Sequence, residues 1–301
     1  MKFIFFGTPE FAAIILEKLI NADFIPEAVV CNPDKPVGRK KIITPPPVKQ
    51  RIMNYELGIR NKIQIFQPEK LDPSLFIIPN SSFDLFIVAA YSQIIPKEIL
   101  KIPQLGAIGI HPSLLPKYRG ASPIQTAILN GDEITGTTLY LMDEQIDNGP
   151  ILTTSHLPLA TSETYESLLK KLAELSADLL IKTLPDIEEK IKNATPQDEL
   201  QATYTKKFKT EDAFIKPEDL KIAQDNSASS PQVAFEIERK IRALNPEPGV
   251  WTIINPHTTT LFGVGVNGKR IKLLEAQISD NKLKLTKIQV EGKKPTLVTS
   301  G

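Results

Sequence analysis

The stretch KFIFFGTPEFAAIILEKL, residues 2–19, decides the fold. It opens with the apolar run at residues 2–6, which lacks alternation and is typical of a parallel strand buried on both faces. In the tight turn that follows, we expect Thr8 to cap a helix that has Pro9 at its first position. A second apolar run, AVVC, occupies residues 28–31. Strand, helix and strand in this order predict a βαβ unit and therefore a parallel sheet.

Expected strands and helices continue to follow one another along the next 160 residues. Further strands are expected at 63–66, 84–91 and 106–110, helices at 48–57 and 123–130, and a long amphipathic helix after Ser162 that Pro185 interrupts. Residues 137–142 and 151–157 are expected to form a hairpin at the sheet edge. The fold class is therefore α/β, a doubly wound and mainly parallel sheet. Residues 32–47, rich in proline, are expected to be a long loop.

The polar, turn-rich segment 193–205 is the expected linker between two domains. A chain of 301 residues suggests two domains, here residues 1–192 and 206–301. In the second domain, short strands follow one helix at 233–243 and are separated by turns. They are expected at 250–254, 260–264, 271–277 and 282–289. This spacing is typical of a small β-barrel.

Composition excludes several classes of protein. Hydrophobic residues are 41% and charged residues 24%, which is ordinary for a globular chain and too apolar for a disordered one. The single Cys31 excludes a disulfide framework. Three widely separated histidines, His111, His156 and His257, argue against a metal site, and we expect none. No run approaches the roughly 20 apolar residues of a membrane helix, so a cytoplasmic, reduced protein is expected.

The net charge of +1 conceals an uneven distribution along the chain. Residues 1–205 hold 20 Lys and Arg against 24 Asp and Glu, a net charge of −4, whereas residues 206–301 hold 16 against 11, a net charge of +5. A basic segment is typical of a protein with a polyanionic partner. A solvated, lysine-rich surface has the same composition, and charge alone does not separate the two.

His111 and Asp147 are the residues best suited to chemistry. His111 directly follows a buried strand, at the sheet edge where ligands bind in open parallel sheets. Asp147 lies on the turn of the predicted hairpin beside that sheet, and a carboxylate there would orient the imidazole for acid–base work. Each residue alone has an ordinary structural explanation, a half-buried histidine or an Asp-Asn-Gly turn. Only the pair suggests catalysis.

Several familiar catalytic and nucleotide motifs are absent from the sequence. Gly7 stands alone after the first strand, so a G-x-G-x-x-G dinucleotide site is disfavoured. There is no phosphate-binding P-loop, no H-E-x-x-H and no G-x-S-x-G nucleophile elbow.

Four stretches resemble the methionyl-tRNA formyltransferases: FFGTPEFAA, NPDKPVGR, AAYSQIIPKEIL and GIHPSLLPKYRGASPIQTAILNGDEITGTTLYLMDEQIDNGPIL. KIRALNPEPGVW extends the resemblance into the C-terminal part. It implies a Rossmann-like catalytic domain with an OB-like C-terminal barrel that binds tRNA. It also implies formyl transfer from 10-formyltetrahydrofolate to the α-amine of methionyl initiator tRNA, for initiation of protein synthesis. We expect a monomer that works without a membrane or a metal.

The resemblance also assigns residues. His111 and Asp147 match the family's catalytic histidine and aspartate. Folate contacts are expected from Ser113, Leu114, Leu115 and Pro116 and, at the neighbouring strand end, from Tyr91, Ser92 and Gln93. Contacts with the tRNA acceptor end are expected from Lys35, Arg39, Lys40 and Lys41.

Gly109 departs from the family pattern, which has an Asn two residues before the histidine. Glycine has no side chain to donate to the oxyanion that forms when an amine attacks the formyl carbon. Gly109 and His111 face the same side of one strand, so we expect a space that holds a water, or help from Ser92.

Two alternatives remain. A sugar-nucleotide N-formyltransferase shares the catalytic core, and a non-catalytic RNA-binding relative would tolerate Gly109. The basic loop argues against the first, and the joint presence of His111, Ser113 and Asp147 argues against the second.

Overall fold

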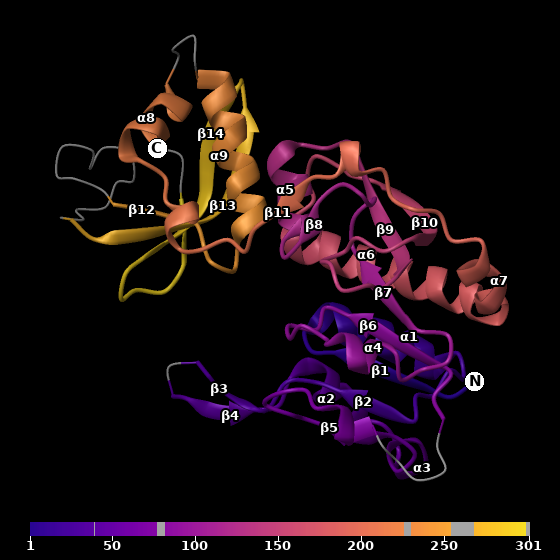
Figure 1. Ribbon diagram of the computed structural model, residues 1–301. Helices are drawn as coiled ribbons and strands as arrows, with labels where there is room; N and C mark the ends of the chain where they lie inside the picture. The colour runs from indigo at the N-terminus through magenta and orange to yellow at the C-terminus, as the bar shows by residue number, and fades with distance from the viewer. Residues whose placement is uncertain (39, 77–81, 226–229, 254–267, 299–301) are drawn as a thin grey trace. The chain divides into compact units, whose positions relative to one another are not determined.

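The structure, a computed structural model, describes residues 1–38, 40–76, 82–225, 230–253 and 268–298. The chain divides into two compact units, one of residues 1–120, 134–158 and 169–204 and the other of residues 121–133, 159–168 and 205–301 (Figure 1). The extent of the domains expected from sequence stays a prediction. Among the described residues, no helix combines the length and the apolar sequence that a membrane span requires.

A seven-stranded sheet forms the centre of the first unit. In spatial order its strands are β10 (Ile151–Pro158), β9 (Ile134–Leu141), β7 (Ala107–His111), β6 (Leu85–Ala89), β1 (Phe3–Gly7), β2 (Ala28–Val30) and β5 (Gln64–Phe66). The strands from β7 to β5 are parallel, and the β9–β10 hairpin adds two antiparallel strands at one edge. The predicted doubly wound sheet with an edge hairpin is confirmed.

Helices follow the strands in the order that a βαβ fold requires. They are α1 (Glu10–Asn21), α2 (Pro47–Met53), α3 (Leu57–Arg60), α4 (Lys97–Leu100), α6 (Tyr165–Thr183) and α7 (Ile187–Lys192). Single 3-10 turns lie at Pro73–Phe76, Leu184–Asp186, Glu199–Gln201 and Glu211–Ala213. Pro185 lies in the turn between α6 and α7, as predicted, whereas the single helix expected at 48–57 is two short ones.

The core of the first unit explains why its strands lack alternation. All five residues of β1, β6 and β7 are buried, since helices or loops cover both faces of the sheet. Phe6 packs against Phe86 and Phe76, with ring centroids 5.1 and 5.7 Å away. This packing fixes the carboxyl ends of the central strands, where the site residues follow.

The expected helix cap at Thr8 is wrong. Pro9 is the N-cap of α1 and the cap has no side-chain hydrogen bond. Thr8 stands one residue too early, and its Oγ1 instead accepts a hydrogen bond from the backbone N–H of Asn32, at 3.2 Å. It thereby ties the β1 turn to the segment after β2.

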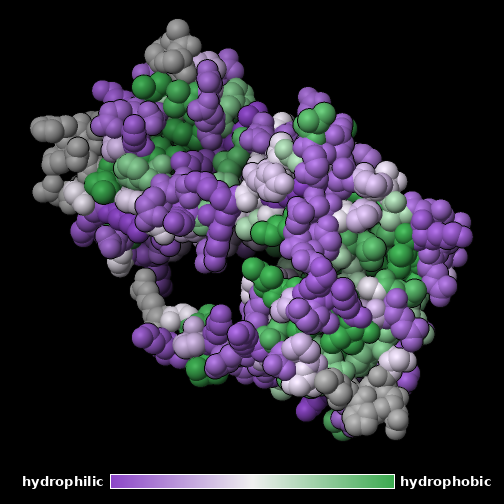
Figure 2. All heavy atoms as spheres, viewed as in Figure 1, coloured by the Kyte–Doolittle hydropathy of each residue, from purple (hydrophilic) through white to green (hydrophobic). Residues whose placement is uncertain are grey.

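Residues 32–47 are not wholly a loop. They contain an antiparallel ribbon of β3 (Lys35–Val37) and β4 (Ile42–Thr44), separate from the central sheet. Proline is tolerated here because a two-stranded ribbon leaves each strand one unpaired edge. The ribbon exposes hydrophobic side chains among hydrophilic ones (Figure 2), with Val37, Ile42 and Ile43 each more than half exposed.

The second unit contains a four-stranded antiparallel sheet and helices. The strands, in order, are β12 (Trp251–Ile253), β13 (Arg270–Ser279), β14 (Lys282–Val290) and β15 (Thr296–Leu297), and the helices are α5 (Pro123–Asn130), α8 (Pro217–Gln224) and α9 (Ser230–Leu244). The strand expected at 260–264 lies outside the described residues. An antiparallel C-terminal domain is confirmed, and closure into an OB-like barrel stays a prediction.

Candidate active site

His111 is the last residue of β7, and two acceptors face its ring. Its Nε2 lies 2.8 Å from the carbonyl oxygen of Tyr118. Because a carbonyl oxygen only accepts, Nε2 carries a proton and donates it. Its Nδ1 lies 3.4 Å from Oδ2 of Asp147. The structure therefore brings together the two residues that the sequence paired.

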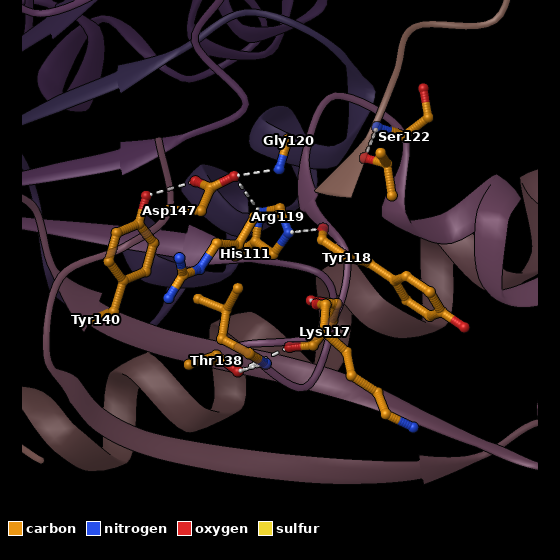
Figure 3. Close-up of polar contacts among 12 residues, drawn as sticks. His111, Lys117, Tyr118, Arg119, Gly120, Ser122, Thr138, Tyr140 and Asp147 are labelled. Carbon is orange, nitrogen blue, oxygen red and sulfur yellow. Dashed lines mark hydrogen bonds and ion pairs between the residues drawn. The ribbon is translucent and has the colours of Figure 1, made fainter. Parts of the chain in front are cut away.

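The β9–β10 connection presents the Asp147 carboxylate to His111 (Figure 3). Oδ2 accepts a hydrogen bond from the backbone N–H of Gly120, and Oδ1 accepts one from the Tyr140 hydroxyl, both at 2.7 Å. Asp147 has a φ of 51°, in the left-handed region. Gly149 is required for close approach, since a Cβ there would stand 1.8 Å from the carbonyl oxygen of Leu141. The Asp-Asn-Gly turn thus also positions the Asp147 carboxylate beside His111.

The space expected beside Gly109 is already filled, so the prediction of a water-holding gap there is wrong. A Cβ on Gly109 would stand 2.3 Å from Cε1 and Cζ of Tyr140. Gly109 and Tyr140 face each other across β7 and β9, which brings the phenol ring over the glycine. Sequence reasoning missed Tyr140, although a glycine inside a buried strand signals that another group approaches closely.

Residues 197–204 form hydrogen bonds with the loop after His111. Tyr118, with a φ of 63°, donates its backbone N–H to Oγ1 of Thr203 at 2.8 Å. The fully buried Arg119 bonds Glu199 and Gln197, and the amide of Gln197 donates to the carbonyl oxygens of Asp147 and Gly149. A two-stranded pairing of β8 (Arg119–Gly120) with β11 (Tyr204–Thr205) continues this contact. The polar, turn-rich composition of residues 193–205 does not predict this pairing.

The first group of expected folate residues lies directly beyond His111. The Ser113 hydroxyl donates to the carbonyl oxygen of Lys117 at 2.6 Å, and its own carbonyl accepts from the Thr138 hydroxyl. Leu115 donates its N–H to the same hydroxyl, and Pro116 accepts from Thr203. The side chain of Leu114 lies against Gly136. This stretch is held by β9 on one side and Thr203 on the other.

The second group of expected folate residues, Tyr91 to Gln93, forms hydrogen bonds with residues that follow β2 and β5. Ser92 accepts a hydrogen bond from the Asn32 side chain at 2.8 Å, and Gln93 donates to the carbonyl of Pro68. Asn32 follows β2, whereas His111 ends β7, on the opposite side of β6. The buried Tyr91 hydroxyl has no hydrogen-bond partner among the described residues, and burial raises its pKa to about 12.

Three of the expected tRNA-binding residues lie on or beside the ribbon. Lys35, Lys40 and Lys41 are exposed, while Arg39 lies outside the described residues. The base of the ribbon is fixed by Asp34, whose carboxylate accepts hydrogen bonds from Gln67 and Lys49. These bonds lower the pKa of Asp34 and keep it ionised. Three of the four predicted basic side chains are therefore exposed on one element whose base is held by hydrogen bonds.

Within the described residues, no three His, Cys, Asp or Glu side chains gather as metal ligands. The expectation that no metal is used stays a prediction.

Two family models match the chain: "Formyl transferase" over residues 1–184 and "Formyl transferase, C-terminal domain" over residues 215–300. The methionyl-tRNA formyltransferase of Staphylococcus epidermidis is 38% identical over an alignment of 312 positions, gaps included, that covers 99% of this chain and 94% of that protein. The enzyme of the same name from Macrococcus caseolyticus is 34% identical, over 97% and 92% of the two chains.

Among solved structures, the methionyl-tRNA formyltransferase of Clostridium thermocellum has a TM-score of 0.54 and 20% identity, over 96% of this chain and 98% of that one. An N-formyltransferase from Helicobacter canadensis, in complex with folinic acid and dTDP-3-aminofucose, has a TM-score of 0.58 and 21% identity, over 93% and 88%. These likenesses establish the fold. The family models and the curated relatives together establish that the chain belongs to the formyl transferase family, among the methionyl-tRNA formyltransferases.

Proposed function

We propose that this protein transfers a formyl group from 10-formyltetrahydrofolate to the α-amine of methionyl initiator tRNA, for the initiation of protein synthesis. The single observation that carries the reaction is the His111–Asp147 pair at the carboxyl end of β7, with Nδ1 and Oδ2 3.4 Å apart. The choice of acceptor is supported by curated relatives named methionyl-tRNA formyltransferase, which align with nearly the whole chain.

A folate donor is supported by solved relatives that hold such a molecule. One is in complex with folinic acid, and another, HypX from Aquifex aeolicus, with tetrahydrofolic acid. In this chain, the buried and unpartnered Tyr91 hydroxyl offers a polar atom that a ligand could satisfy. We assign folate contacts to Tyr91, Ser92 and Gln93 and to the stretch from Ser113 to Pro116. When bound, the folate supplies the formyl group.

The His111–Asp147 pair supplies the proton acceptor and the hydrogen-bond donor that acyl transfer to an amine needs. Attack of the amine on the formyl carbon releases a proton from nitrogen and places negative charge on the formyl oxygen. The Asp147 side chain is the more exposed of the two, 16% against 7%, so we assign it the role of proton acceptor. We assign to His111, which Tyr118 and Asp147 hold in place, the hydrogen bond to the formyl oxygen. The proton then passes to the nitrogen that leaves the formyl carbon, so the transfer consumes none.

The ribbon is the proposed contact with the tRNA acceptor end. Lys35, Lys40 and Lys41 are exposed on or beside β3 and β4, and Arg39 is their neighbour in sequence. Exposed lysines on one element suit phosphate contacts. The net charge of +5 on residues 206–301 suits the same partner. We propose that the protein acts as a monomer.

A sugar-nucleotide N-formyltransferase is the second candidate, because two solved structures of similar TM-score are named sugar N-formyltransferases and a third is in complex with dTDP-3-aminofucose. One experiment separates the candidates. The protein is incubated with 10-formyltetrahydrofolate and either methionyl initiator tRNA or amino-sugar nucleotides, and formylated product is measured. We expect product with the tRNA alone. Product with the sugar nucleotide alone supports the second candidate, and binding of tRNA without product supports a non-catalytic RNA-binding relative.

A further inference from the structure

Gly109 and Tyr140 form a complementary pair across two neighbouring strands. They are direct partners in the β7–β9 register, one without a side chain and one with a large ring. A Cβ on Gly109 would stand 2.3 Å from two ring carbons and 2.6 Å from the hydroxyl oxygen of Tyr140. The ring thus occupies the volume that any side chain at position 109 would need.

The ring delivers its hydroxyl to Asp147. Tyr140 is only 4% exposed, and its hydroxyl donates to Oδ1 of Asp147 at 2.7 Å (Figure 3). Oδ2 of the same carboxylate faces Nδ1 of His111. Burial first, and the charge of Asp147 second, raise the pKa of Tyr140 well above its ordinary value, so the phenol stays a neutral donor at physiological pH.

We propose that Tyr140 is a positioning residue of the reaction: its hydroxyl holds the Asp147 carboxylate against His111. Tyr140 acts through Asp147 and touches no substrate. The inference rests on the proposed function for its kinetic test. It also gives a reason for the glycine at position 109, because any side chain there would collide with the ring that carries this hydroxyl.

The first test removes only the hydroxyl. In Tyr140→Phe, we expect kcat to fall about 10- to 100-fold, the effect of losing one hydrogen bond to a charged group, while KM for both substrates changes less than threefold. Thermal unfolding should change little, because the ring still fills the space. The matched control is Tyr55→Phe, which removes a hydroxyl bonded to Asn21 and leaves kcat unchanged. A kcat within twofold of the parent in Tyr140→Phe overturns the proposal.

The second test supplies a hydrogen-bond donor for Asp147 from the opposite strand. Gly109→Asn alone should lose activity and unfold at a lower temperature, because its Cβ collides with the phenol ring. Gly109→Asn combined with Tyr140→Leu frees that volume and puts an amide near the position of the lost hydroxyl. We expect at least tenfold higher kcat than in the matched control, Gly109→Ala with Tyr140→Leu. Equal rates in the two double variants show that the positions share no role and overturn the proposal.

A spectroscopic test is independent of turnover. The chain has three histidines, so protein labelled with ¹⁵N-histidine gives few imidazole signals. Tyr140→Phe should shift the signals of His111 and leave those of His156 and His257 in place. If the parent protein formylates no acceptor, the proposed function fails, while this measurement still decides the role of Tyr140. Unshifted His111 signals contradict it.

Discussion

At the scale of single residues, His111 and Asp147 should behave as one unit. Their side chains face each other at 3.4 Å and both are largely buried. We expect His111→Ala and Asp147→Ala each to reduce formyl transfer by about 10²–10⁴-fold, typical of losing an acid–base group. The double variant should lose little more than the worse single variant, because residues that act together are not additive.

The measurement is kcat/KM of each variant, with His156→Ala as control. His156 lies exposed on β10 and pairs with Gly136, away from the carboxylate. Its loss should leave the rate within twofold. Fully multiplicative losses in the double variant would show that His111 and Asp147 do not cooperate.

Cys31 should make the fold sensitive to alkaline pH. It is fully buried, and this burial raises the pKa of its thiol from 9.0 to about 12. The neutral thiol is favoured by folding, so its contribution is complete below pH 9 and declines as pH rises toward 12. Between pH 8 and pH 10.5 the free energy of unfolding should fall by about 1–2 kcal/mol more in the parent than in Cys31→Ala. Urea denaturation at both pH values measures this, and equal losses in the two proteins refute it.

At the scale of elements, the segment 197–204 is hydrogen-bonded to the loop after His111. Arg119 connects the two, because its guanidinium bonds Gln197, Glu199 and Tyr204 at once. Arg119→Lys keeps the charge and loses the planar fork, so we expect the free energy of unfolding to fall by about 1–3 kcal/mol. We also expect kcat to fall, since Gln197 holds the Asp147 turn. Arg60→Lys, at the exposed end of α3, is the control and should change neither quantity.

The ribbon should contribute to tRNA binding and not to folate binding. Replacing both Lys40 and Lys41 with Ala should raise KM for the tRNA severalfold and leave KM for the folate unchanged. The slope of log affinity against log salt should become shallower by about one for each phosphate that the variant no longer neutralises. The control is Lys101→Ala, at the exposed end of α4. An unchanged tRNA constant and salt slope would remove the ribbon from the recognition surface.

Periodicity could predict most elements of the first unit because its central strands are buried on both faces and β9 and β10 form an edge hairpin. It could not predict the ribbon, since proline content at 32–47 speaks only against helix and central strand. The His111–Asp147 pair could be predicted because a strand end and a neighbouring hairpin turn must meet. The role of Tyr140 could not be predicted from the sequence, because its position over Gly109 depends on the register between β7 and β9.

At the scale of the whole molecule, the two units interleave along the chain. Residues 121–133 and 159–168 belong with the C-terminal residues, although they lie well before the turn-rich segment 193–205. Within that unit, α5 packs against α9. The turn-rich segment 193–205 marks one of the passages between the units.

This interleaving has a consequence for synthesis. About 100 residues separate the end of α5 at Asn130 from the start of α9 at Ser230, and at roughly 5–20 residues per second translation takes several seconds or more to cross them. During that interval α5 has left the ribosome without its partner helix, and its apolar face, with Ile124 and Ile128, lacks its final cover. The apolar face of α5 is therefore synthesised well before the helix that packs against it.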